Sequence, residues 1–223
     1  MNAALLVAAV VAAILTAEQA NWDLPTGGLL LVFAIASDQM AMRIRASRVR
    51  VSGSFLAIVV AMVLLGGAPA AAIGVLAILA GWLREREKPH FLLANLMFYS
   101  TFPVVGGLVF TTVRDHWSLV PGDAAFAVAV MGVFVLSLGM NFLMVAAYIR
   151  HIEGRPILET ARRALFPLLT SDLVAAVLAV GVSYVTLSYG YGALALFGIL
   201  LLAFQHLLAA LLTSEERAED LQK

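Results

Sequence analysis

Few side chains in this sequence could do chemistry, and those few are single polar groups inside long apolar segments. Asn95 lies near the start of one such segment, Asn141 lies well inside another, and Asp172 lies close to the start of a third. Gln205 and His206 are adjacent in the last one. Polar groups inside apolar helices are costly, and they mark either functional sites or contacts between helices. These five residues are therefore the candidate ligand-binding or polar-core residues.

Each candidate also has a structural interpretation. The two asparagines could hydrogen-bond between helices. Asp172 either pairs with Arg162 or Arg163 or faces an internal cavity, and the sequence leaves both open. The adjacent glutamine and histidine suit polar packing, because a lone histidine is weak evidence for a metal or haem. We therefore predict no metal site, and the sequence identifies no cofactor.

Catalytic motifs are absent from the sequence. It contains no Walker A phosphate loop, no GxSxG, no HExxH and no CxxC. The absence of cysteine excludes disulfides and thiolate metal ligands. A formal net charge of zero gives no reason to expect nucleic acid as a partner. We therefore expect no enzymatic activity from these residues.

The elements that hold these polar residues are predicted to lie in a lipid bilayer. Of the 223 residues, 62% are hydrophobic and 13% charged, and the mean hydropathy is +0.98. Soluble domains are about 45–50% apolar and about 25% charged. The apolar segments do not alternate with polar residues, which favours helices over barrel strands. The eight segments are residues 3–17, 25–41, 51–65, 68–83, 91–113, 124–149, 165–187 and 193–213.

A break is predicted between the third and fourth segments. As one helix, residues 51–83 would be about 50 Å long, whereas the hydrocarbon core is about 30 Å thick. The sequence GGAP at 66–69 supplies a helix break. We therefore predict an all-α, polytopic transmembrane bundle of about eight membrane helices. Its third and fourth helices form a short hairpin that need not cross the bilayer fully.

The basic residues predict the orientation of this bundle. With eight segments, 13 of the 14 lysines and arginines fall on one side, and only Arg114 falls on the other. Cytoplasmic loops collect Lys and Arg, so both termini are expected in the cytoplasm. Trp22, Trp117 and Tyr184 lie in the opposite loops, where they suit the headgroup level. The loops of that side are short, so any ligand must enter the bundle itself.

The C-terminal residues are typical of a signalling linker. The last segment continues without Gly or Pro into the charged sequence SEERAEDLQK. Leu211, Ala218 and Leu221 belong to a heptad-like spacing that could pair two copies through the last helix. We therefore divide the chain into a membrane bundle, residues 1–213, and the start of a cytoplasmic helical linker, residues 214–223.

These features together resemble the N-terminal membrane input regions of bacterial cyclic-di-GMP enzymes of the GGDEF and HD-GYP families. The resemblance rests on GGAPAAAIGVLAILAGWLRER, on HFLLANLMFYS with Asn95, and on Asn141 before HIEGRPILETARRALFPLL. It implies a sensor in the bacterial inner membrane that relays a ligand or membrane signal through its last helix to a cytoplasmic output domain. Catalysis would belong to a domain beyond Lys223.

A second family offers an alternative. The length, the short loops and the alanines Ala8, Ala9, Ala12 and Ala13 also resemble the vitamin-capturing membrane subunits of energy-coupling uptake systems. That resemblance implies a small molecule bound inside the bundle and a partner docked on the alanines. A stably co-purifying small molecule would favour the uptake subunit. Both interpretations imply the lipid bilayer as a partner, and the sensor interpretation allows a small hydrophobic ligand.

Overall fold

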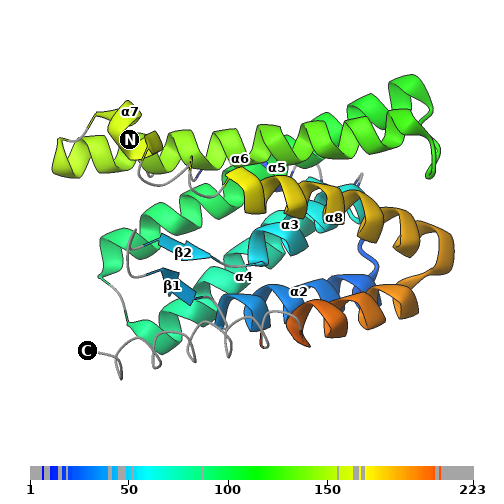
Figure 1. Cartoon of the computed structure of the whole chain (residues 1–223), viewed down its shortest axis with the longest axis horizontal. Helices are drawn as coiled ribbons and strands as arrows, with labels where there is room; N and C mark the ends of the chain where they lie inside the picture. Colours follow the sequence, from blue (N-terminus) through cyan, green and yellow to red (C-terminus); the bar gives the residue numbers. More distant parts are fainter. Residues whose placement is uncertain are drawn as a thin grey trace, which may run out of the picture.

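The structure is a computed structural model that describes residues 7, 11–14, 17–18, 20–39, 42–44, 49–51, 53–86, 88–154, 156–162, 166, 169–203 and 206. The described chain is helical apart from one two-stranded hairpin (Figure 1). Its elements are α2 (Leu24–Gln39), β1 (Met42–Ile44), β2 (Val49–Val51), α3 (Ser54–Leu64), α4 (Gly67–Glu85), α5 (Pro89–Trp117), α6 (Ala124–Glu153), α7 (Ile157–Thr160), α8 (Leu169–Tyr189) and a last helix, Tyr191–Ala203.

Helix α3 forms the centre of the bundle. Its sequence, SFLAIVVAMVL, is apolar on every side, and Ile58, Val59 and Met62 are fully buried. Helices α2, α4, α5, α6 and α8 all contact it. A helix that is hydrophobic all round must be covered all round, and α3 is covered by protein. Its 11 residues give a length of only about 16 Å.

The predicted break between α3 and α4 is confirmed. Helix α3 ends at Leu64 and α4 begins at Gly67, with Gly66 between them at φ 95°. That left-handed conformation is open to glycine at little cost. The backbone N–H of Asn21 donates to the carbonyl of Leu65 at 2.9 Å, so a preceding segment covers the turn.

Helices α4 and α5 pack at backbone contact. A Cβ added at Gly107 would overlap the backbone of Gly67, and one added at Gly74 would lie 2.8 Å from the carbonyl oxygen of Tyr99. That carbonyl is the one to which Pro103, four residues on, has no N–H to donate. Small residues allow helices to approach this closely, so glycine at these positions sets the spacing of the pair.

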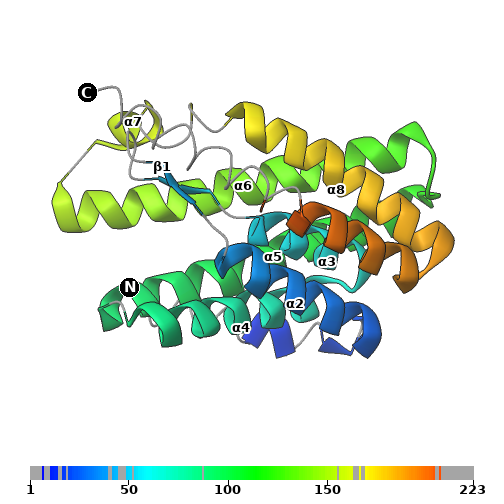
Figure 2. The same cartoon turned by 60° about the horizontal axis from the view of Figure 1, so that its bottom comes forward.

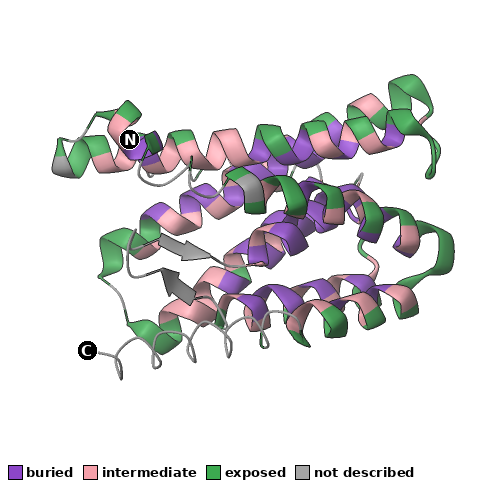
Figure 3. Ribbon diagram, in the orientation of Figure 1, coloured by how far each residue is buried: buried purple, intermediate pink, exposed green. Residues whose placement is uncertain are grey.

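Four described helices are long and apolar enough to cross a membrane: α4, α5, α6 over Ala124–Ile152, and α8 over Ser171–Tyr189. Helices α2, α3 and Tyr191–Ala203 are apolar but shorter. Most of the first expected segment lies outside the described residues. Figure 3 shows burial concentrated where the helices face one another, while the outer face of α6 is exposed. Exposed apolar faces of this kind are typical of helices solvated by lipid.

The helices run back and forth along one direction, so their connections gather at two ends (Figures 1 and 2). One end, on the left in Figure 1, holds the β-hairpin and the connections from α4 to α5 and from α6 to α7. The opposite end holds the connections from α5 to α6 and from α8 to the last helix. The left end carries basic residues in each connection, whereas the opposite end carries Arg114.

The all-α prediction is confirmed for the described chain apart from one short β-hairpin. The segment RIRASRVR was expected to be a loop, but Met42 pairs with Val51, Arg43 with Arg50 and Ile44 with Val49 in antiparallel register. The physical reason is visible in the sequence, because apolar residues alternate with arginine in both strands. Alternation with period two is the strand pattern.

Candidate functional site

The polar residues selected from the sequence do not form a common site. Asn95 lies in α5, Asn141 in α6 and Asp172 in the first turn of α8, and all three are partly buried. None of the three side chains makes a hydrogen bond or an ion pair with another described residue. Contacts across α5 and α6, at Gly106 with Ser137 and at His90 with Tyr148, set the register of the pair.

Asn141 differs from the other two candidates, because its Oδ1 is buried and has no hydrogen-bond partner among the described residues. The expected interhelical hydrogen bond is therefore not formed there. The hydroxyl oxygens of Ser183 and Thr186 in α8 are buried in the same way. A buried acceptor without a donor is costly, so these three groups are weak points of the packing.

The ion pair expected for Asp172 is not formed with Arg162, and pairing with Arg163 stays a prediction. Arg162 is exposed, while Arg163 lies outside the described residues. Asp172 also lines neither of the two hollows discussed below. The role of Asp172 as a ligand-binding or polar-core residue therefore stays a prediction.

The remaining candidates lie at the end of the chain. His206 is exposed, and no cluster of three or more metal-ligating side chains occurs among the residues described. Gln205 and the linker residues Leu211, Ala218 and Leu221 lie outside the described residues. The heptad-like pairing therefore stays a prediction.

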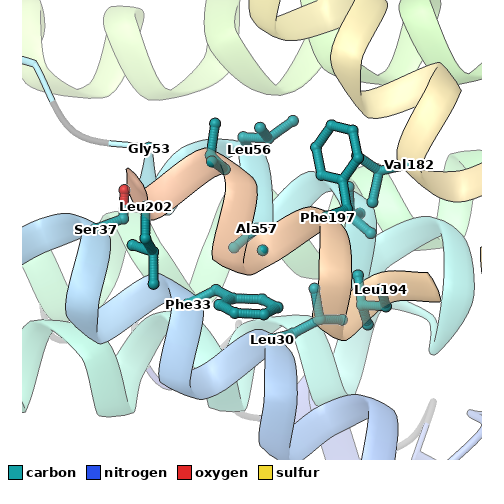
Figure 4. Close-up of a pocket in the computed structure, with 13 residues that line it drawn as sticks. Leu30, Phe33, Ser37, Gly53, Leu56, Ala57, Val182, Leu194, Phe197 and Leu202 are labelled. Atoms are coloured by element: carbon teal, nitrogen blue, oxygen red, sulfur yellow. The ribbon is translucent and has the colours of Figure 1, made fainter. Parts of the chain in front are cut away.

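The structure does contain a hollow that the polar residues did not indicate. It is an apolar crevice between α2, α3, α8 and the last helix, and Ser37 is the one polar side chain that lines it (Figure 4). Its lining residues are Leu30, Phe33, Ser37, Gly53, Leu56, Ala57, Val60, Val182, Leu194, Phe197, Gly198, Leu201 and Leu202. We call this hollow the apolar crevice.

The last helix forms one whole wall of the apolar crevice. Leu194 and Gly198 face inward and are buried, whereas Leu196, Ile199 and Leu200 on the other face are about 60% exposed. The last helix lies beside α2 in both views (Figures 1 and 2). It is therefore a peripheral helix that is held on one side only, through the crevice residues.

One close contact joins this wall to α2. The ring of Phe33 lies against Gly198, in the space that a side chain at 198 would occupy. Figure 4 shows the Phe33 ring between α2 and the last helix, with Leu30 and Leu194 beside it. Because Gly198 has no side chain, the last helix can approach α2 closely enough to cover the ring.

The size of the apolar crevice limits what it holds in this arrangement. The crevice is partly open, and its volume is about 30 Å³, which is room for about two water-sized groups. Water would find few hydrogen-bonding partners on these walls, so the space suits an apolar group such as the end of an acyl chain. Pockets for whole small molecules are roughly 300–1,000 Å³, so a larger occupant would have to displace the last helix.

Sequence reasoning missed the apolar crevice because all of its residues except Ser37 are of the types found in ordinary apolar packing. Ala57, Phe33 and Gly198 each belong to a segment in which most neighbours are equally apolar. Gly198 in a Leu-rich helix is the one signal that could have indicated a close approach.

Comparisons of the chain with family models, with curated proteins and with solved structures find no match.

Proposed function

We propose that this chain is a membrane-embedded input module, in which the last helix reports whether an apolar group occupies the crevice. The observation that carries the proposal is that one face of the last helix forms a wall of a small, partly open apolar hollow. The same helix leads directly to the residues that follow 206 in the sequence. A change in the position of this helix would therefore be passed on to whatever follows it.

The proposed mechanism is a shift between two packings of the last helix. In the closed packing Phe33 covers Gly198 and the crevice is small. In the open packing the last helix moves away from α2 and α3, so a lipid chain or hydrophobic ligand can enter. An occupant shifts this balance only by the difference in its affinity for the two packings. An apolar occupant meets that condition, because it gains contacts only when the space is open.

The finer topology is part of the proposal. We place the end with the β-hairpin in the cytoplasm and count about eight membrane segments, including three shorter helices and the segment near the N-terminus. The support is charge, because this end gathers the arginines of three connections while Arg114 is at the other. Both termini would then be cytoplasmic, as in the input regions of the cyclic-di-GMP enzymes that the sequence resembles.

We further propose that two copies pair through the helix that continues the last one, with Leu211, Ala218 and Leu221 at the contact. Pairing would convert movement of the last helix into a rotation or register shift of the linker. The support is the heptad-like spacing in the sequence.

Photolabelling tests occupancy of the apolar crevice. The full chain in nanodiscs is irradiated with a diazirine-bearing fatty acid, and labelled peptides are mapped by mass spectrometry. We expect labelling at Phe197, Leu201 and Leu202, and competition by a membrane lipid extract. Ala57→Val fills the space from the α3 side and should reduce that labelling severalfold.

The matched control is Ala147→Val, which makes the same change on the exposed face of α6. Circular dichroism checks that both variants are folded. Equal labelling of the last helix in the Ala57→Val and Ala147→Val variants would contradict occupancy of the apolar crevice. A stoichiometric co-purifying small molecule that is not displaced by lipid would favour the uptake subunit instead.

A further inference from the structure

A second hollow lies at the opposite end of the bundle from the basic connections. It is an open depression of about 400 Å³ between the α5–α6 connection, the start of α6 and the second half of α8. Its lining residues are Gly122, Asp123, Phe126, Ala127, Val180, Gly181 and Tyr184. This volume is within the range of small-molecule sites, unlike that of the apolar crevice.

The walls of this depression combine one carboxylate with aromatic rings. Asp123 precedes α6 and makes no capping hydrogen bond, and its side chain has no partner among the described residues. The Tyr184 ring lies against Gly122, because a Cβ added at Gly122 would be 3.2 Å from Tyr184 Cε2. Phe126 is buried in the wall. Gly122 has φ 102°, so the turn and the approach of the ring both favour glycine there.

This combination favours a positively charged ligand. Aromatic faces with a nearby carboxylate are the chemistry that recognises ammonium groups, above all quaternary ones. The N-terminus of α6 attracts negative charge, and Asp123 already supplies that charge. Binding of an anion at the same place is therefore disfavoured. The arginine at this end, Arg114, already pairs with the adjacent Asp115 at 3.0 Å. The depression therefore has no free arginine to hold an anion.

We propose that this depression binds the ammonium group of an organic cation, with Asp123 as its charge partner and Tyr184 and Phe126 as its apolar and aromatic walls. The cation is either a free quaternary amine or the ammonium headgroup of a lipid. Both carry the same group, and the depression is placed where headgroups lie if the bundle spans a bilayer. This site does not depend on the apolar crevice or on the proposed movement of the last helix.

Saturation-transfer NMR on the full chain in detergent tests the site, with choline as the probe. The neutral isostere 3,3-dimethylbutan-1-ol has the same shape without the charge. We expect choline to bind and the isostere to bind much more weakly. Asp123→Asn should weaken choline binding by about tenfold or more, because it removes a charge-assisted contact.

Two further variants make the result specific. Asp115→Asn removes a carboxylate from the same end, at a residue that pairs with Arg114 and does not line the depression, and should leave choline binding unchanged. Gly181→Leu should block the site without disturbing the helices, because a Cβ at Gly181 meets nothing within 4 Å.

Native mass spectrometry with phosphatidylcholine and phosphatidylglycerol then identifies the source of the ammonium group. Retention of phosphatidylcholine that is lost in Asp123→Asn assigns the site to a lipid headgroup, and choline binding alone assigns it to a free amine.

The proposal is overturned if neither choline nor phosphatidylcholine binds. It is also overturned if the isostere binds as tightly as choline, or if Asp123→Asn and Asp115→Asn bind choline equally.

Discussion

The ring of Phe33 in α2 lies directly against Gly198 of the last helix, in the space where a side chain at 198 would begin. The two residues are 165 positions apart in the sequence, and together they hold the peripheral helix onto the bundle. The absent side chain of Gly198 is thus what allows the apolar crevice to close. Any side chain at this position would push the last helix away from α2 or force the ring to turn.

Gly198→Ala should therefore destabilise the closed packing. We expect a loss of about 1–3 kcal/mol in the free energy of unfolding, as is usual for overpacking. In a chain that already carries Phe33→Leu, Gly198→Ala should lower the free energy of unfolding by less than it does in the natural chain. The difference should be about 0.5–3 kcal/mol, because residues in contact are coupled. Reversible unfolding in mixed micelles, followed by circular dichroism, measures both costs. Strictly additive costs would show that the contact does not hold the last helix.

The contact between α4 and α5 predicts a large difference between two identical substitutions. Gly107→Ala places a methyl group onto the backbone of Gly67 and should cost about 1–3 kcal/mol or more. Gly132→Ala in α6 meets nothing within 4 Å and should be neutral, or stabilising by up to about 1 kcal/mol. Thermal unfolding of the two variants under the same conditions checks this. Similar unfolding temperatures would contradict the close packing of α4 and α5.

Asn141 offers a test of the polar candidates. Its buried Oδ1 has no partner among the described residues, so Asn141→Leu removes an unsatisfied acceptor and keeps a similar volume. We expect the free energy of unfolding to stay the same or to rise by up to about 1–3 kcal/mol, because the cost of burying an unpaired acceptor is removed. The measurement is again the free energy of unfolding. A loss above about 2 kcal/mol would mean that Asn141 has an essential partner.

The orientation predicts which residues a membrane-impermeant thiol reagent can reach. The natural chain has no cysteine, so single cysteines report without background. Val120→Cys, in the exposed α5–α6 connection, should react in intact cells. Lys88→Cys, before α5 at the other end, should react only after the membrane is permeabilised. The reverse pattern would show that the bundle has the opposite orientation in the membrane.

Much of the fold could be predicted from the sequence because lipid imposes strong rules on composition. Continuous apolar segments predicted the helices, and GGAP predicted the turn at Gly66. The β-hairpin was missed because its strands are three residues each, too short for their alternation to stand out within a basic segment. The central position of α3 could not be predicted either. Its hydropathy is that of a membrane helix, and only the surrounding helices reveal that it is a buried core element.

The hollows could not be predicted for a different reason. Whether Ala57 or Val182 lines a space depends on how four helices approach one another, and this is not encoded in any local pattern. The polar residues carried the clearest chemical signal, yet Asn95, Asn141 and Asp172 are not brought together. Tyr184 was expected to be an interfacial anchor, and its proximity to Gly122 and Asp123 appears only in the folded chain.

Spin-label distances test the central claim, which is that the last helix moves when the crevice is occupied. Labels at Val32 in α2 and at Ile199 in the last helix, both on exposed faces, report the distance between these two helices. Labels at Leu76 in α4 and Leu108 in α5 provide a reference across the closely packed pair. On adding the membrane lipid extract to the chain in nanodiscs, we predict that the first distance changes by about 1–2 Å or more. The reference distance should stay the same, and Ala57→Val should abolish the change. No change in the Val32–Ile199 distance, or an equal change in both pairs, would contradict the account.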